Sequence, residues 1–528
     1  MSISRRSFLF KTSGVIVPAM HALGMLMPAP AHAFELQGDS KGKHILILGA
    51  GLAGLTTAYE LRKLGYSCTI LEARERTGGR CWSVRKGSIG IENGNQQQTA
   101  AFDDGLYFNA GPSRIPHHHA LTLYYCREFN VPVQVYNNVN ESAYYYSEGS
   151  GPLSNKKIRT REIHNDVRGH MNEWLAKAID QQKLDAAFTK EDGEKILEYI
   201  RAEGGLNIDK LYRASERRGY IESPGAGDRA GKLGEPHKLA DIVSSGLMSP
   251  DFYNVAEYTY ELQMTMFQAI GGMDKIAEAI TNKIGQIVQL GAEVKSITNS
   301  GAGVQVKYKQ GGAEKMIEAD YCVCTIPLPV LSNIEHNFSS DTSRAIDFVP
   351  YISTGKIGLQ FKRRFWEEDE QIYGGITHTN NELTQIFYPS YDYLGKKGIL
   401  IGYYNFNDKA KKTGNLSFEA RERLALEKGK RIHTQYDAEF EKSFSVSWER
   451  TKYSQGGWSL YNNESRQTSY KALCKPDGNT YFAGEHVTYL NSWMAGAFES
   501  ARKVTTDIHA RVTEQRVSYP SAFSTTTS

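Results

Sequence analysis

Near the start of the chain, an apolar segment, an amphipathic segment and a second apolar segment follow one another. Lys43–Leu48 and Ser67–Leu71 have the short apolar runs of buried strands. Between them, the apolar residues of Ala53–Leu64 recur at helical spacing. This order predicts a strand–helix–strand unit, the usual start of an α/β domain.

The remaining pattern predicts a helical region and then an antiparallel sheet. From about Leu121 to Ala240 the chain is polar and helical, and the glycines and prolines of 224–236 predict an exposed loop. Further predicted helices cover 263–290, 416–435 and about 495–512. Predicted strands cover 291–308, 315–326, 356–361, 371–377, 383–388, 398–405 and 480–483.

Composition excludes several classes of protein. The chain has 528 residues, of which 40% are hydrophobic and 23% charged, enough for about two or three globular domains. The whole chain has a formal net charge of +3. The first 33 residues contain Arg5, Arg6 and Lys11 and no acidic residue, so the rest of the chain has a net charge of zero. Without a basic surplus, we expect no nucleic-acid partner, and no later apolar run is long enough to span a membrane.

Residues 1–33 have the features of an export signal. Arg5 and Arg6 stand before Phe8-Leu9, a weakly apolar stretch follows, and Ala31-His32-Ala33 is a small-residue cleavage candidate. The pattern resembles a bacterial twin-arginine signal, which implies export of a folded protein to the periplasm or beyond. The six cysteines lack metal-ligand spacing and are expected to be free thiols.

A dinucleotide-binding motif follows the first predicted strand. Gly49, Gly51 and Gly54 form a GxGxxG turn that opens the predicted helix, where backbone amides can meet a pyrophosphate. Glu72 ends the second strand, at the position where an acid accepts from a ribose hydroxyl. A second glycine pair, Gly78-Gly79, then precedes Arg80, which favours FAD over NAD.

These motifs and others make the chain resemble the flavin-dependent amine oxidases, and within them the L-amino-acid oxidases. The segments that carry the resemblance are 49–54, 71–80, 110–116, 268–276, 355–366, 386–390 and 482–500. The resemblance implies a mixed α/β fold with a Rossmann-like FAD-binding domain, a mostly antiparallel substrate-binding sheet domain and a helical domain. The expected ranges are 1–33 for the signal, 40–116, 255–330 and 478–512 for FAD binding, 117–254 for the helical domain and funnel, 331–477 for substrate binding, and 513–528 for a flexible tail.

The resemblance also assigns site residues. Lys356 and Trp493 are expected beside the reaction, and Arg114, Tyr388, Trp493 and Ser492 around the substrate. The expected FAD contacts are Gly49, Gly51, Leu52, Ala53, Gly54, Glu72, Ala73, Arg74, Gly79, Arg80, Gly111, Pro112, Ser113, Arg114, Val294, Gly484, Glu485, Trp493 and Met494. A guanidinium suits a carboxylate because it forms two parallel charge-assisted hydrogen bonds.

Strand alternation places Lys356 on the opposite face of its strand from Ile357 and Leu359. That face is either exposed to solvent at a sheet edge or directed to the active site.

The tract His117–His119 has no cysteine or acid at metal-ligand spacing. We therefore expect a solvated loop at the funnel rim there, and no metal.

The implied reaction is oxidation of an L-amino acid by O2 through hydride transfer to flavin N5, giving a 2-oxo acid, ammonia and hydrogen peroxide. Large apolar or aromatic amino acids are the expected substrates, a homodimer is possible, and exported peroxide would be antibacterial. Three alternatives stay open: an amine or polyamine oxidase, an amino-acid monooxygenase, and a flavin-binding protein without turnover.

Overall fold

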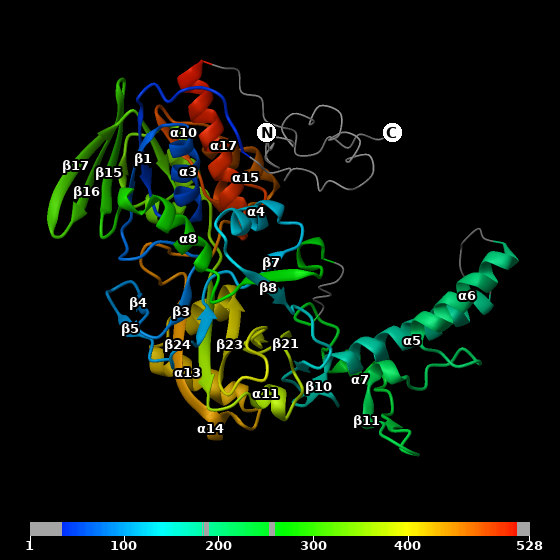
Figure 1. Ribbon diagram of the computed structural model, residues 1–528. Coiled ribbons are helices and arrows are strands. Elements are labelled where there is room, and N and C mark those ends of the chain that lie inside the picture. Colours follow the sequence, from blue (N-terminus) through cyan, green and yellow to red (C-terminus); the bar gives the residue numbers. More distant parts are fainter. Residues whose placement is uncertain (1–33, 182, 184–188, 253–258, 515–528) are drawn as a thin grey trace, which may run out of the picture.

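A computed structural model describes residues 34–181, 183, 189–252 and 259–514 (Figure 1). The expected export signal, residues 1–33, lies outside this range, as does 515–528 of the expected tail. Helices and strands are intermixed along the chain, and the strands form several separate sheets. The fold is the expected mixture of α and β structure.

A five-stranded parallel sheet forms the centre of one half of the molecule. Its order is β14 (Val288–Gln289), β2 (Ser67–Leu71), β1 (His44–Leu48), β18 (Tyr321–Cys324) and β25 (Thr480–Phe482). One face packs on helices α3 (Leu52–Lys63), α4 (Ala120–Glu128), α8 (Lys275–Ile284) and α17 (Met494–Thr513). The predicted strand–helix–strand unit is confirmed as β1, α3 and β2.

The opposite face of this sheet packs on a smaller antiparallel sheet. Strands β15 (Glu293–Ser300), β16 (Gly303–Gln310) and β17 (Ala313–Ala319) lie side by side, with β19 (Glu335–His336) beside β15. They stand at one edge of the molecule (Figure 1). Cys322 and Cys324 both enter the core between the two sheets, and all six cysteines are free, as expected.

A seven-stranded sheet forms the second half. Its order is β10 (Lys157–Arg159), β9 (Tyr144–Tyr146), β21 (Ile376–Thr379), β22 (Gln385–Phe387), β23 (Gly398–Phe406), β20 (Thr354–Phe361) and β24 (Phe440–Ser447). All pairings are antiparallel except that of β9 with β21. The strand β20 lies between β23 and β24, so Lys356 is not on a solvated edge.

The helical part is smaller than the predicted range 117–254. Helices α5 (Thr160–Asp180) and α6 (Lys190–Gly204) project from the body as a long arm, with α7 (Leu239–Ser244) at its base (Figure 1). The preceding α4 instead packs beside α17, and β9 and β10 belong to the seven-stranded sheet. These contacts join residues far apart in sequence, which a polar helical pattern does not predict.

One long predicted helix, 263–290, is wrong. The segment contains β13 (Met266–Ala269), then α8, then a short turn into β14. Gly271 and Gly272 have φ values of 83° and 117°, which no helix accommodates, so the helix begins only at Lys275. Within the described residues, no helix has the length and apolar character needed to cross a membrane.

Limited proteolysis is expected to cut the loop 224–236 first. This segment holds the turn of a hairpin between β11 (Tyr220–Glu222) and β12 (Lys232–Leu233), together with β12 itself, and its residues are almost all exposed. Its backbone packs on little else, so a protease can unfold it locally at low cost. Trypsin should cleave at Arg229 or Lys232, as read by mass spectrometry of the first fragments. First cleavage elsewhere in 34–514 would contradict this expectation.

Candidate active site

A cavity of about 430 Å³ lies between the carboxyl ends of the parallel strands and the seven-stranded sheet. Its wall includes most of the expected cofactor contacts: Gly49, Gly51, Leu52, Ala53, Glu72, Ala73, Arg74, Gly79, Arg80, Gly111, Pro112, Val294, Gly484, Glu485, Trp493 and Met494. Lys356 and Ser492 line it too. Four expected residues do not: Gly54, Ser113, Arg114 and Tyr388. The cavity therefore joins segments that are hundreds of residues apart.

The turn before α3 forms one end of this cavity. Gly54 packs the helix against the turn, because a Cβ at this position would lie 2.0 Å from the carbonyl oxygen of Gly49. No side chain caps the first amides of α3, and its first turn holds no acid. These amides and the helix dipole leave partial positive charge at the cavity wall, which suits a pyrophosphate.

Glu72 is fixed beside this turn at the end of β2. Its two carboxylate oxygens accept from the backbone N–H groups of Ala50, at 2.8 Å, and Arg74, at 2.9 Å. The side chain is buried, so these hydrogen bonds compensate the lost hydration of its charge. The carboxylate is thereby held at the cavity wall where the sequence motif places a ribose contact.

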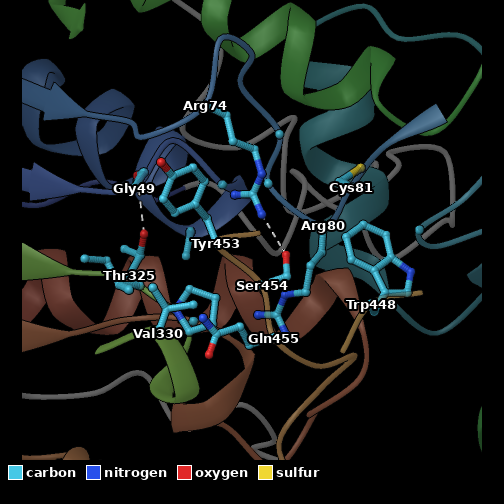
Figure 2. A pocket seen from close by; sticks show the side chains of 18 of the residues that line it. Gly49, Arg74, Arg80, Cys81, Thr325, Val330, Trp448, Tyr453, Ser454 and Gln455 are labelled. Carbon is cyan, nitrogen blue, oxygen red and sulfur yellow. Dashed lines mark hydrogen bonds between the residues drawn. The ribbon is translucent and has the colours of Figure 1, made fainter. Parts of the chain in front are cut away.

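Two arginines bring buried positive charge to the middle of the cavity (Figure 2). Arg74 donates to Ser454 Oγ at 2.7 Å and to the carbonyl oxygen of Lys452 at 3.0 Å. Arg80 donates to Glu485 Oε1 at 2.9 Å. Burial lowers the pKa of Arg74 because it disfavours the charged guanidinium, and the Glu72 carboxylate, 3.7 Å away, offsets part of this cost. An anion in the cavity would relieve this cost.

The residues present fit FAD. The cavity offers a helix N-terminus and arginines for the pyrophosphate and Glu72 for a ribose. Val294, which lies near the carboxyl end of β2, is available for the adenine. Sequence reasoning missed the wall formed by Trp448, Tyr453, Ser454, Gln455 and Trp458. No motif marks this segment; it reaches the cavity because it follows β24, at the edge of the other sheet.

Lys356 forms the other end of the cavity. Its Nζ donates to the carbonyl oxygens of Asn109 at 3.0 Å and Gly111 at 2.5 Å, and to Ser113 Oγ at 2.9 Å. Ile357, Leu359 and Phe361 face the opposite core, so the predicted alternation is confirmed. Burial and then the nearby charge of Arg114 lower the pKa of Lys356 to about 7.

Tyr404 is the tyrosine at this end of the cavity, and sequence reasoning missed it. It lies opposite Lys356 in the β20–β23 pairing, and Lys356 Nζ is 4.5 Å from the centre of its ring. A register shift at Gly402 places Tyr403 in the core and turns Tyr404 to the cavity. Simple alternation from Leu400, which is in the core, would have assigned the opposite faces.

The expectation that Tyr388 binds substrate is wrong. Its hydroxyl is hydrogen-bonded to Thr377 Oγ1 at 2.8 Å and His433 Nε2 at 2.6 Å, in the core on the far side of the sheet. Alternation turns the preceding residue, Phe387, to the other face, where its ring lies 5.9 Å from the Arg114 guanidinium carbon. The segment is near the site, but its tyrosine points away from it.

Arg114 lies just outside the cavity wall, half-buried beside Lys356 and Tyr404. It donates to Asn138 Oδ1, and among the described residues it has no acidic partner. Its charge lowers the pKa of Lys356 and counteracts the rise that burial causes at Tyr404. Within the part of the chain that the structure describes, neither of the two cations at this end of the cavity is paired with a carboxylate.

Trp493 and Ser492 complete the wall. Trp493 is the residue before α17, and its ring meets that of His119 edge-on at 4.9 Å. Ser492 has a φ of 72°, a left-handed conformation that costs free energy in a serine. The loop before them is held by Arg466, which donates to the carbonyl oxygen of Thr488 at 2.8 Å and to Asn491 Oδ1 at 3.0 Å.

Substituting Gly51 by alanine should weaken FAD binding by at least about tenfold without destabilising the flavin-free protein. A Cβ at Gly51 meets no protein atom within 4 Å, so it would occupy only the space in which the cofactor lies. Titration with FAD, followed by flavin fluorescence, measures the affinity. Gly285→Ala adds an equally unhindered methyl group outside the cavity and should bind like the parent. Equal affinity of the two variants would contradict this placement.

The comparisons with known proteins agree with this geometry. The sequence profile described as flavin containing amine oxidoreductase matches residues 52–509. A Bacillus subtilis (strain 168) protein, YobN, assigned only provisionally as an L-amino-acid oxidase, is 28% identical over 90% of this chain and 96% of its own. An L-amino acid oxidase of Bothrops pictus is 28% identical over 90% and 91%.

Solved structures of amine oxidases share the fold. Wild-type putrescine oxidase bound to putrescine superposes with a TM-score of 0.58 at 17% identity, over 89% of this chain and 99% of that one. Cyclohexylamine oxidase from Brevibacterium oxydans IH-35A gives a TM-score of 0.59 at 15% identity, over 89% and 100%. From the profile match over most of its length, the chain belongs to the flavin-containing amine oxidoreductases, and FAD is its cofactor.

Proposed function

We propose that the protein is an L-amino-acid oxidase that converts an L-amino acid, O2 and water into a 2-oxo acid, ammonia and hydrogen peroxide. The observation that carries this proposal is Arg114, a half-buried guanidinium without an acidic partner among the described residues. A substrate carboxylate would supply the missing negative charge. A simple amine has no such group, and its ammonium form would be repelled by Arg114 and Lys356.

The substrate would be oriented by contacts to both ends of the amino-acid headgroup. Arg114 would pair with the carboxylate, and the Tyr404 hydroxyl, at the same end of the cavity, would donate a further hydrogen bond. Trp493 and the backbone of Ser492 would bound the amine side. FAD, held by the glycine turn, Glu72 and the arginines of the cavity, would supply the redox chemistry, as acceptor of the hydride from the substrate Cα and donor of electrons to O2. The protein then supplies mainly orientation and a fixed electrostatic field.

Two aromatic rings beside Arg114 support a preference for large apolar or aromatic amino acids. Phe387 lies next to the guanidinium, and Tyr136 is buried within reach of its charge. Such rings bury a large apolar area and would favour a substrate side chain that covers them. The twin-arginine segment supports export as the second half of this proposal, so that peroxide would form outside the cytoplasm.

The substrate class is tested with paired compounds. Purified FAD-loaded protein should release peroxide, ammonia and the 2-oxo acid from L-phenylalanine, and should be inactive with phenethylamine and with D-phenylalanine. Mass spectrometry of the product separates a 2-oxo acid from the amide that a monooxygenase would form. Activity with phenethylamine but not with the amino acid would instead support an amine oxidase.

Replacing Arg114 by glutamine should lower kcat/KM for L-phenylalanine by on the order of 100-fold, because a bidentate charged contact is lost. Tyr404→Phe removes one hydroxyl and should lower it by about tenfold. Tyr388→Phe is the matched control, since it removes a hydroxyl that is bonded only within the core.

The control should keep kcat/KM within about twofold of the parent even if its thermal stability falls. Flavin content, read from the visible spectrum, shows that each variant is loaded. A larger loss of kcat/KM in Tyr388→Phe than in Tyr404→Phe would overturn the assignment of the two tyrosines.

Lys356 should make the reaction with O2 depend on pH near neutrality. Its pKa is lowered to about 7, so the ammonium form is present below that pH and is lost as the pH rises through it. A cation at this position stabilises negative charge that develops on O2 as it is reduced. We expect kcat/KM for O2 to fall above about pH 7 in the parent.

Lys356→Met keeps the length of the side chain without its charge. It should lower kcat/KM for O2 by at least about tenfold and abolish the pH dependence near 7. Oxygen-electrode measurements at several pH values test this. A variant with the same pH profile as the parent would show that another group titrates.

A further inference from the structure

The tract His117–His119 meets an acid that the sequence does not place near it. Strands β7 (Ile115–Pro116) and β13 pair antiparallel, with Met266 opposite Pro116. The backbone N–H of His117 extends the pairing by donating to the carbonyl oxygen of Thr265 at 3.1 Å. Residues that leave β7 therefore lie beside residues that approach β13. This arrangement brings Glu261, in the short turn Tyr260–Leu262, to the histidines.

Three side-chain atoms converge at this point. His118 Nε2 is 3.1 Å from Glu261 Oε2, and His119 Nε2 is 2.9 Å from the same oxygen. One ligand atom from each of the three residues lies within 4.8 Å of the other two. In a tetrahedral zinc site the ligand atoms are about 3.3 Å apart, because Zn–N and Zn–O bonds are about 2.0–2.2 Å. The two histidine–carboxylate distances are already close to this value, and the spacing of the two histidine ligand atoms is within 4.8 Å.

The surroundings also suit a bound cation. The side chains of His118 and His119 are 14% and 3% exposed, so both imidazoles are held by packing, and Tyr260 packs against His118 with 4.3 Å between ring centres. Glu261 is 33% exposed, which leaves a path from solvent. Three protein ligands would leave a fourth position for water.

We propose that His118, His119 and Glu261 form a binding site for a divalent transition-metal ion, zinc by preference. Imidazole nitrogens suit zinc, and two histidines with one glutamate form a known type of zinc site, whereas calcium and magnesium take oxygen ligands. The ion would fasten the Tyr260–Leu262 turn to the loop after β7. Because the His119 ring packs on Trp493, a metal ion at this site would also stabilise the position of Trp493 in the cavity wall. Its role is structural support rather than chemistry on the substrate.

The test is zinc titration of the FAD-loaded full chain after chelator treatment, with any polyhistidine tag removed. Isothermal titration calorimetry should show one zinc ion per chain with a Kd on the order of 1 μM or tighter. Glu261→Gln and His118→Gln should each weaken binding by at least about tenfold. His117→Gln is the matched control, because this exposed neighbour is outside the convergent group.

Zinc-edge X-ray absorption gives a second readout that requires no turnover. It should report only nitrogen and oxygen ligands, at about 2.0–2.2 Å. The proposal is overturned if the parent binds no zinc, or if Glu261→Gln and His118→Gln both bind it as the parent does. Should one variant fail to fold, the other decides. Because zinc binding is measured without substrate, its failure leaves the proposed oxidase activity untouched, and the reverse also holds.

Discussion

The contacts of the Lys356 ammonium hold the two halves of the molecule in register. Lys356 belongs to the seven-stranded sheet, whereas its acceptors Asn109, Gly111 and Ser113 belong to the segment that leads to Arg114. Three acceptors match the three N–H groups of an ammonium, so the contact fixes both distance and direction. A buried cation without such partners would be costly. Together with the hydrogen bond from Trp448 Nε1 to the carbonyl oxygen of Ala110 at 3.0 Å, these contacts set the position of Arg114 relative to the cavity.

The cavity wall carries both cations and carboxylates. Arg74 and Arg80 line it, Lys356 lies at one end, and Arg114 lies beside Lys356 just outside the wall. Arg80 is paired with Glu485 and Arg74 lies 3.7 Å from Glu72, while burial lowers the pKa of Arg74 and of Lys356. Burying several cations together is unfavourable unless anions join them. A pyrophosphate at the centre and a carboxylate at the end would supply that charge.

The far side of the seven-stranded sheet also holds buried polar groups, and several of them are bonded to one another within the protein. Tyr388, His433 and Thr377 form one network, and Glu370 accepts from Tyr144 and Lys157 beside it. These bonds hold the sheet rigid behind the cavity. This core contrasts with the cavity wall, where no side chain caps the first amides of α3.

The sequence by itself determined the local units and the nucleotide-binding half of the site. Strand, glycine turn, helix and terminal acid are close in sequence, so their spacing specifies their geometry, and the alternation around Lys356 likewise specified its face. Only the tertiary structure decided which tyrosine faces the cavity, since the shift at Gly402 turns Tyr404 to the cavity and Tyr388 belongs to the core. It alone also brought Glu261 to His118 and His119, and the 448–458 segment to the cavity. Such contacts join residues that are far apart in sequence, and strand pairing brings them together. A local pattern of residues predicts a strand but does not specify the strand with which it pairs.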